Sequence, residues 1–356
     1  MTFSQNADAN VFFSCWKSPS NIALIKYWGK SGNQIPANAS MSITLKEAYT
    51  LTRIKAGLIR NGGGPEVEFR FEGEINEAFG GRIESFLKSV VSYLPFLKEA
   101  RLEIESGNNF PHSAGIASSA SAMSALALCL CSLEKEITGL ETGMEAFLRK
   151  ASFIARIGSG SACRSVYGGI PVWGSHKAVE GSDNEYAVPL SFDLHPVFSE
   201  IRDTILIVDP GQKKVSSSVG HNLMKGHAYA DARYKQAESN LTAMLVALKQ
   251  GDWDTFSLIT ENEALSLHAM MMTSRPGYLL MHPNSLIIIE KVIEFRKQSG
   301  SAICFTLDAG PNVHLLYPAF ETEKVRPLID ELKVFCHKGT AIDDTMGSGP
   351  EKLNCR

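Results

Sequence analysis

The chain has 356 residues, 44% of them hydrophobic, and its 35 Lys and Arg against 38 Asp and Glu give a formal net charge of −3. That length predicts one large domain or two, with enough apolar residues for a sizeable core. Because there is no basic excess, nucleic acid is not an expected partner. No stretch approaches the ~18 consecutive apolar residues of a membrane span, so no membrane association is expected.

The cysteines and the N-terminus indicate the compartment. The seven cysteines form no CxxC pair and their number is odd, a pattern that predicts neither a zinc site nor a disulfide framework. The first residues have no basic segment followed by an apolar one, as a signal peptide would. We therefore expect a reduced, cytoplasmic protein.

Periodicity predicts strands first and mixed elements later. Alternating or β-branched runs predict strands near residues 12–16, 22–27, 41–45, 51–55 and 67–71. Apolar steps of three and four then predict helices from about 116 to 130 and from 143 to 157, and later near 230–248, 255–271, 285–298 and 321–335. Further strands are expected near 169–173, 204–208, 302–307 and 314–317. This order favours an α+β fold of two domains, 1–195 and 196–356, with the boundary in the segment 179–199.

The run SPSNIALIKYWGK, residues 18–30, is the densest cluster of polar chemistry. Asn21, Lys26, Tyr27 and Lys30 lie within ten residues of it. Two ammonium groups, a phenol and an amide on a short strand and turn favour binding of a polyanion.

Residues 106–120, SGNNFPHSAGIASSA, lead from a strand through a loop into an Ala/Ser-rich helix. The N-terminus of a helix binds phosphate through unpaired N–H groups and the positive end of the dipole. Gly115 permits close approach of the backbone, while Ser118 and Ser119 offer hydroxyls to phosphate or to a phosphate-bound magnesium. A tightly packed helix beside a sheet is an equally good interpretation of this stretch alone.

Residues 157–165, IGSGSACRS, alternate Gly and Ser before an arginine. Ser159 and Ser161 fit an anion-binding turn, and the planar fork of Arg164 suits a carboxylate. The alternative is a flexible turn with a surface arginine. Cys163 is either an activated thiolate beside Arg164 or, more simply, a small buried residue.

Two further stretches are candidates. In residues 304–312, CFTLDAGPN, Asp308 follows an apolar run and precedes Gly-Pro, so it either projects catalytically from a strand end or caps a turn. In residues 212–218, QKKVSSS, Ser217 and two lysines suggest another anion contact or a solvated helix start. Of the nine histidines, His112 alone lies within a candidate site.

Together, NIALIKYWGK, NNFPHSAGIASSASA, GSGSACRSVYGG and FTLDAGPN resemble the diphosphomevalonate decarboxylases. That family belongs to the superfamily of galactokinase, homoserine kinase, mevalonate kinase and phosphomevalonate kinase (GHMP). The matches span Asn21 to Asn312 in the family's order. The resemblance implies a two-domain GHMP-kinase-like fold with the active site in the interdomain cleft, a homodimer, and use of ATP and Mg²⁺.

The resemblance also implies residue roles. Mevalonate 5-diphosphate is phosphorylated on its tertiary hydroxyl, and loss of that phosphate and of carbon dioxide gives isopentenyl diphosphate. Asp308, Lys26 and Arg164 match catalytic positions, and Gly115, Ser118 and Ser119 match the ATP phosphate site. The substrate-binding positions of the family match Asn21, Tyr27, Lys30, Ser159, Ser161 and Ser217. No dedicated protein metal cage is implied.

The chain departs from the family at His112, Ser113, Ser218 and His221, where the last replaces a frequent Met. These departures leave the proposed chemistry intact. Relatives in the same branch leave two sister activities open, either on mevalonate 5-phosphate or as a mevalonate 3-kinase. The presence of Asp308, Lys26 and Arg164 together favours decarboxylation. A catalytically silent binding protein on the same fold is the alternative of a different class.

Overall fold

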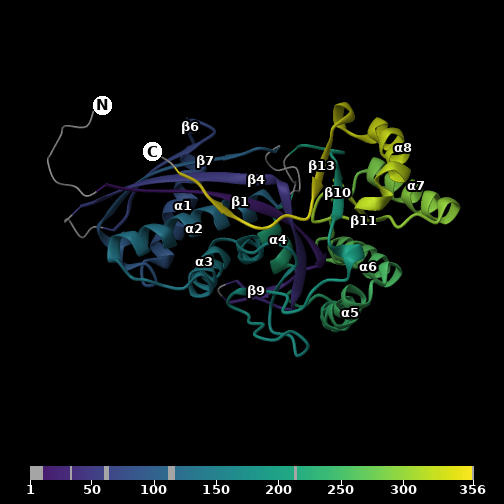
Figure 1. The fold of residues 1–356 in the computed structure, drawn as a ribbon, viewed down its shortest axis with the longest axis horizontal. Coiled ribbons are helices and arrows are strands. Elements are labelled where there is room, and N and C mark those ends of the chain that lie inside the picture. Colours follow the sequence, from purple (N-terminus) through teal and green to yellow (C-terminus); the bar gives the residue numbers. More distant parts are fainter. Residues whose placement is uncertain (1–10, 33, 60–63, 111–116, 212–214, 355–356) are drawn as a thin grey trace.

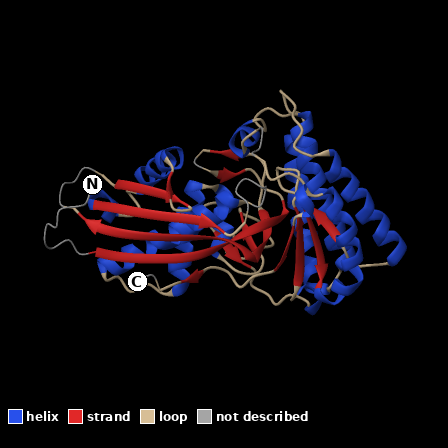
Figure 2. Cartoon of the chain, turned by 90° about the horizontal axis from the view of Figure 1, so that it is seen from above, coloured by secondary structure: helices blue, strands red, loops and turns tan. Residues whose placement is uncertain are grey.

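The computed structural model describes residues 11–354 except 33, 60–63, 111–116 and 212–214. Its two main sheets lie side by side along the long axis of the molecule, with helices packed on them (Figures 1 and 2). The elements up to residue 190 are β1 (Val11–Ile25), β2 (Lys30–Ser31), β3 (Ile35–Pro36), β4 (Ser40–Leu58), β5 (Glu66–Phe71), β6 (Glu74–Ile75), α1 (Glu77–Val90), β7 (Ala100–Asn108), α2 (Ser118–Thr138), α3 (Met144–Gly158), the 3₁₀ helix η2 (Gly160–Val166), β8 (Pro171–Trp173) and β9 (Ala187–Pro189). The later elements are β10 (Ile201–Leu206), α4 (Ser217–Asn222), α5 (Ala230–Gln250), α6 (Trp253–Thr273), α7 (Pro283–Ser299), β11 (Cys304–Thr306), β12 (Val313–Pro318), α8 (Thr322–Leu332), β13 (Ala341–Thr345) and β14 (Glu351–Lys352).

The first sheet has the order β14-β1-β4-β7-β5-β6, and outside this order β8 pairs with β4 and β9 pairs with β8. Burial alternates along β7, where Leu102 and Ile104 are buried and Glu105 is exposed, as expected for a sheet with one covered face. Helices α1, α2 and α3 cover that face (Figure 1), and Leu87 of α1 and Leu126 of α2 pack into the same cluster.

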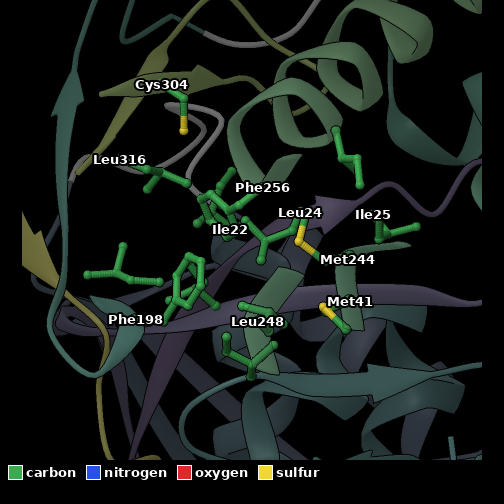
Figure 3. Packing of buried hydrophobic residues seen from close by; sticks show 14 of the residues in the cluster. Ile22, Leu24, Ile25, Met41, Phe198, Met244, Leu248, Phe256, Cys304 and Leu316 are labelled. Atoms are coloured by element: carbon green, nitrogen blue, oxygen red, sulfur yellow. The ribbon is translucent and has the colours of Figure 1, made fainter. Parts of the chain in front are cut away.

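A bend in β1 directs the chain towards the second half. The pairing of β1 with β4 shifts register between Pro19 and Asn21, and a bulge of this kind bends a strand. Beyond it, Ile22 and Leu24 pack with Met244 of α5 and Phe256 of α6 (Figure 3). The end of β1 therefore lies in a core that both halves of the chain build.

The second sheet has the antiparallel order β11-β12-β10-β13. One face packs on α7 and α8, and the other joins the core of Figure 3 through Cys304 and Leu316. Two features connect this sheet to the first one. The carboxylate of Asp344 in β13 accepts backbone hydrogen bonds of 2.7–2.9 Å from residues 46, 47 and 48 in β4, and β14 then pairs with β1.

The expected α+β composition is confirmed, with differences in detail. The helices predicted near 143–157, 230–248, 255–271 and 285–298 correspond to α3, α5, α6 and α7. The helix predicted near 321–335 corresponds to α8 followed by the 3₁₀ helix η5 (Lys333–Phe335). The strands expected at 12–16 and 22–27 form one strand that ends at Ile25, and those at 41–45 and 51–55 form β4. The domain boundary at residues 195 and 196 stays a prediction, since the halves share a core and β14 returns to the first sheet.

The expectation of fully reduced cysteines is wrong at one position, because Cys15 in β1 is disulfide-bonded. Five other cysteines are free and buried, namely Cys129, Cys131, Cys163, Cys304 and Cys336. Within the described part of the chain, no helix combines the length and the apolar character needed to cross a membrane.

Candidate active site

Lys26 and Asp308, 282 residues apart in sequence, form an ion pair between the two halves of the chain. Lys26 directly follows β1, and Asp308 lies in the loop between β11 and β12. The Lys26 Nζ is 2.9 Å from the Asp308 Oδ1, and the side chains are 2% and 24% exposed. Burial lowers the pKa of Lys26, while the charge of Asp308 opposes this shift. The carboxylate is thus the accessible member of the pair.

Arg164 lies in η2 and is 2% exposed. Its Nε donates to the Ser42 Oγ at 3.0 Å, its Nη1 to the Ser40 Oγ at 2.6 Å and its Nη2 to the Asn21 Oδ1 at 3.4 Å. These three acceptors are neutral, so the guanidinium keeps its charge without a carboxylate partner among them. The alternative of a surface arginine is excluded. A buried guanidinium whose hydrogen-bond acceptors are all neutral can bind an anion.

Asn21 links Arg164 to the serine-rich turn. Its Nδ2 donates to the Ser165 Oγ at 2.8 Å and to the Ser161 carbonyl at 3.4 Å. Ser159 is the residue between α3 and η2, and Ser161 is the second residue of η2. The turn predicted from the alternating Gly and Ser is therefore fixed against β1.

Tyr27 lies against the same turn, and its hydroxyl is buried without a hydrogen-bond partner among the described residues. A Cβ added at Gly160 would lie 3.1 Å from the Tyr27 hydroxyl oxygen, so glycine permits this close approach. The phenol ring contacts Trp173 and His221, with ring centroids 4.7 and 4.2 Å apart. Burial raises the pKa of Tyr27, so the hydroxyl remains a neutral donor.

Lys30 and Ser217 lie on the outer side of this cluster. The Lys30 Nζ donates to the Gln34 Oε1 at 2.9 Å, and partial burial lowers its pKa. Ser217 is exposed and begins α4, four residues before His221. The Nδ1 of His221 accepts the Gly29 N–H at 2.9 Å, which fixes α4 against the loop that precedes β2, where Lys30 is the first residue.

Ser118 and Ser119 are the first two residues of α2, as the phosphate-binding interpretation requires. Ala117 precedes them in a left-handed conformation, with φ of 42°, and no described side chain caps the first turn. Gly115 lies outside the described residues, as do His112, Lys213 and Lys214. Among the residues that are described, no group of three or more His, Cys, Asp and Glu side chains could hold a metal ion.

Cys163 is a small buried residue rather than an activated thiolate. Its Sγ donates to the Gly160 carbonyl at 3.0 Å. Burial raises its pKa to about 12, although Arg164 and Arg156 act in the opposite direction. The thiol therefore packs within the turn and is no nucleophile at neutral pH.

Comparison with known proteins identifies the family. A model described as the diphosphomevalonate decarboxylase-like N-terminal domain matches residues 18–185, and one for the mevalonate 5-diphosphate decarboxylase C-terminal domain matches residues 204–354. The diphosphomevalonate decarboxylase of Aspergillus fumigatus is 30% identical over 336 residues, covering 90% of this chain and 80% of that protein. This chain belongs to the diphosphomevalonate decarboxylase family.

Solved structures agree with this assignment. Mevalonate diphosphate decarboxylase from Staphylococcus aureus has a TM-score of 0.82 and 29% identity, covering 97% of this chain and 98% of that one. The complex of MDDEF with MVAPP, AMPPCP and magnesium has a TM-score of 0.81 and 28% identity, covering 97% and 100%. The expected GHMP-kinase-like fold and an enzyme of the decarboxylase class are thus confirmed.

Several residues around this decarboxylase site were missed from the sequence. His112 was the only histidine expected there, yet His221 contacts Tyr27 and the Nε2 of His268 lies 3.0 Å from the Asp308 carbonyl oxygen. Glu263 on α6 accepts the Lys26 N–H at 2.8 Å and is paired with Arg233 on α5. The available signal was a charged residue on the apolar face of a predicted helix, such as Arg233 between Ala230 and Ala237.

Proposed function

We propose that this chain converts mevalonate 5-diphosphate to isopentenyl diphosphate, phosphate and carbon dioxide, with ATP becoming ADP, and that Asp308, Lys26 and Arg164 form its reacting centre. The family assignment supports the reaction class. The observation that carries the residue roles is the Lys26–Asp308 ion pair near a buried arginine whose hydrogen-bond acceptors are neutral.

Asp308 is the candidate group that accepts or orients the proton of the tertiary hydroxyl. Its side chain is 24% exposed, so substrate can reach it, and the 2.9 Å contact with Lys26 fixes its direction. The ammonium of Lys26 offsets negative charge as the crowded hydroxyl reacts. The nucleotide is a co-substrate that supplies a phosphoryl group to this hydroxyl and so makes it a leaving group.

Arg164 is the candidate group that holds the substrate carboxylate. Ser40, Ser42 and Asn21 fix the orientation of the guanidinium by accepting three of its N–H groups. Decarboxylation needs the breaking carbon–carbon bond aligned with the departing phosphate, and a planar fork orients a carboxylate well. Burial of Arg164 also excludes water, which strengthens its interaction with an anion.

The 5-diphosphate is proposed to bind to Tyr27, Lys30, Ser159, Ser161 and Ser217, with Asn21 bridging to Arg164. The buried hydroxyl of Tyr27 beside Gly160 has no hydrogen-bond partner among the described residues, and this supports the assignment, because a buried donor without an acceptor is costly unless a ligand supplies one. The Lys30 ammonium adds positive charge at the outer side of the cluster.

The nucleotide phosphates are proposed to bind at the start of α2. Ser118 and Ser119 fit that group, since they begin α2 with adjacent hydroxyls and no described side chain caps its first turn. Gly115 is included in this site because it matches the family's phosphate loop. Mg²⁺ is proposed to arrive with the nucleotide, with a serine hydroxyl and phosphate oxygens as its ligands. A homodimer and a cytoplasmic location remain predictions, of which light scattering after size exclusion tests the first.

Purified protein with ATP and Mg²⁺ tests the function when mevalonate, its 5-phosphate and its 5-diphosphate are offered separately and the products are identified by mass spectrometry. Isopentenyl diphosphate, ADP and phosphate formed only from the 5-diphosphate support the proposal. Phosphorylation without decarboxylation indicates a 3-kinase, and preference for the 5-phosphate indicates the other sister activity. No turnover of any of the three would indicate a silent binding protein.

A further inference from the structure

A fully buried ion pair lies directly behind Lys26. The carboxylate of Glu263 on α6 receives both terminal nitrogens of Arg233 on α5, with 3.1 Å between Nη1 and Oε1 and a second contact between Nη2 and Oε2. The two side chains are 0% and 1% exposed, and the Asn240 Nδ2 adds a 2.7 Å hydrogen bond to Oε1. Charged residues are almost never buried to this extent unless paired.

This pair contacts the backbone of Lys26 on both sides. The Lys26 N–H donates to the Glu263 Oε2 at 2.8 Å, and the Lys26 carbonyl accepts from the Asn38 Nδ2 at 3.0 Å and the Arg233 Nη2 at 3.5 Å. Lys26 lies one residue beyond the end of β1, so the ladder between strands no longer fixes its backbone. Side chains supply that constraint instead.

Four charged groups surround the Lys26 ammonium. Asp308 from the loop after β11 and Glu263 from α6 both favour its protonated form, whereas Arg164 from η2 disfavours it. Arg233 from α5 completes the set as the counterion of Glu263. Burial lowers the pKa of Lys26, and each of the two carboxylates opposes this shift and so favours the ammonium form.

We propose that Glu263 is a positioning residue for the reaction, which holds the backbone of Lys26 so that the ammonium meets Asp308, with Arg233 as its counterion. This inference rests on the proposed function for the roles of Lys26 and Asp308. A pair that only joined α5 to α6 would need no contact with the end of β1. The bond from the Lys26 N–H to Glu263 connects that pair to the reacting centre.

Glu263→Gln tests the proposal, because glutamine keeps the size of the side chain but loses the charge that fixes it against Arg233, and so it holds the Lys26 N–H less firmly. We expect kcat to fall about tenfold with KM little changed, since misplacing a reacting group acts on the chemical step. The basic limb of the kcat profile, on which Lys26 loses its proton, moves to lower pH by about one unit. An unchanged basic limb would overturn the proposal.

Glu261→Gln is the matched control. Glu261 lies on the same helix two residues earlier and forms an ion pair with Arg296, 2.6 Å between Nη1 and Oε1, without contacting Lys26. The Glu261→Gln variant loses stability as Glu263→Gln does, but the basic limb of its kcat profile stays at the same pH as in the wild type. An equal shift in both variants would show a general effect of weakening α6, and the positioning role would then be wrong.

Two further measurements keep the test decisive if Glu263→Gln folds poorly or if turnover is absent. The double variant Arg233→Met with Glu263→Gln removes both charges, leaves no buried charge unpaired and shows the same shift of the basic limb. The titration of Lys26, followed by NMR with ¹³C-labelled lysine and assigned by Lys26→Met, requires no substrate. A lower titration midpoint in the variants supports the inference even if the 5-diphosphate proves not to be the substrate, and an identical midpoint sinks it.

Discussion

Arg164 and Arg233 are each 2% exposed, but their surroundings differ. Arg233 donates with both terminal nitrogens to the carboxylate of Glu263, so its charge is neutralised inside the protein. Arg164 donates to two serine hydroxyls and one amide oxygen, which orient a guanidinium without neutralising it. Burying a cation whose hydrogen-bond acceptors are all neutral costs stability, which the charge of Asp308 opposes, and an anionic substrate offsets that cost further when it binds.

The two carboxylate pairs repeat this contrast. Glu263 is 0% exposed and closed to substrate, whereas Asp308, paired with Lys26, is 24% exposed. Burial alone therefore does not separate a structural ion pair from a catalytic one. The charge of the partners and the access to the carboxylate separate them.

Removing the accessible carboxylate has the largest expected effect. Asp308→Asn preserves shape but loses the base and its charge, so turnover falls ~10³-fold or more while the protein still folds, with some loss of stability because the buried Lys26 loses its counterion. Steady-state kinetics beside thermal unfolding measures both. Near-normal turnover in a folded variant would show that Asp308 has no part in the reaction.

Breaking the closed pair, which is the fully buried ion pair between Arg233 and Glu263, mainly affects stability. Arg233→Met leaves Glu263 buried without its counterion, which lowers the free energy of unfolding by about 3–5 kcal/mol. Urea denaturation measures the loss. The control is Arg296→Met, because Arg296 is 29% exposed and water compensates its partner Glu261 in part, so its loss is smaller. Equal losses in the two variants would contradict the assignment of Arg233–Glu263 as the closed pair.

Substitution of Arg164, whose hydrogen-bond acceptors are all neutral, is expected to have the opposite outcome. In Arg164→Met no carboxylate loses a hydrogen-bonded partner, and only the charge interaction with Asp308 is removed, so stability falls much less than in Arg233→Met. The value of kcat/KM falls roughly 10²-fold, the order expected for charge-assisted hydrogen bonds worth about 1.5–3 kcal/mol. Kinetics and urea denaturation of the same preparation provide both numbers. A stability loss as large as that of Arg233→Met, with activity kept, would reverse the comparison.

Local pattern in the sequence predicted most helices, because the period of the apolar face reports directly on burial. It divided β1 in two, since Ser18-Pro19-Ser20 has the composition of a turn. In the structure the long pairing with β4 absorbs these residues through a register shift. Helix α1 was missed, although Asn76 caps it by accepting the Phe79 N–H.

The site was predictable where the residues form short motifs that resemble a family, as for Lys26, Arg164 and Asp308. Their supporting contacts were not predictable in the same way. Glu263 and Lys26 are 237 residues apart, and no local pattern specifies which buried backbone group a helix carboxylate meets. The position of the charged Glu263 on an apolar helix face indicates that it has a buried polar partner, but it does not show which residue that partner is.

The smallest expected effect concerns His221, an ionisable group that is buried in its neutral form. It differs in this from the two arginines, which are buried as cations. Burial, with Lys30 nearby, lowers the pKa of His221 to about 3, against about 6.5 for an unfolded histidine. Below pH 6.5 only the unfolded state takes up this proton, so stability falls as pH drops towards 3, by about 2 kcal/mol between pH 7 and 5. His221→Met removes this contribution, whereas His337→Met, at an exposed histidine, keeps it. Urea midpoints at the two pH values measure the difference, and an unchanged pH dependence in His221→Met would mean that His221 is protonated in the folded protein, as the arginines are.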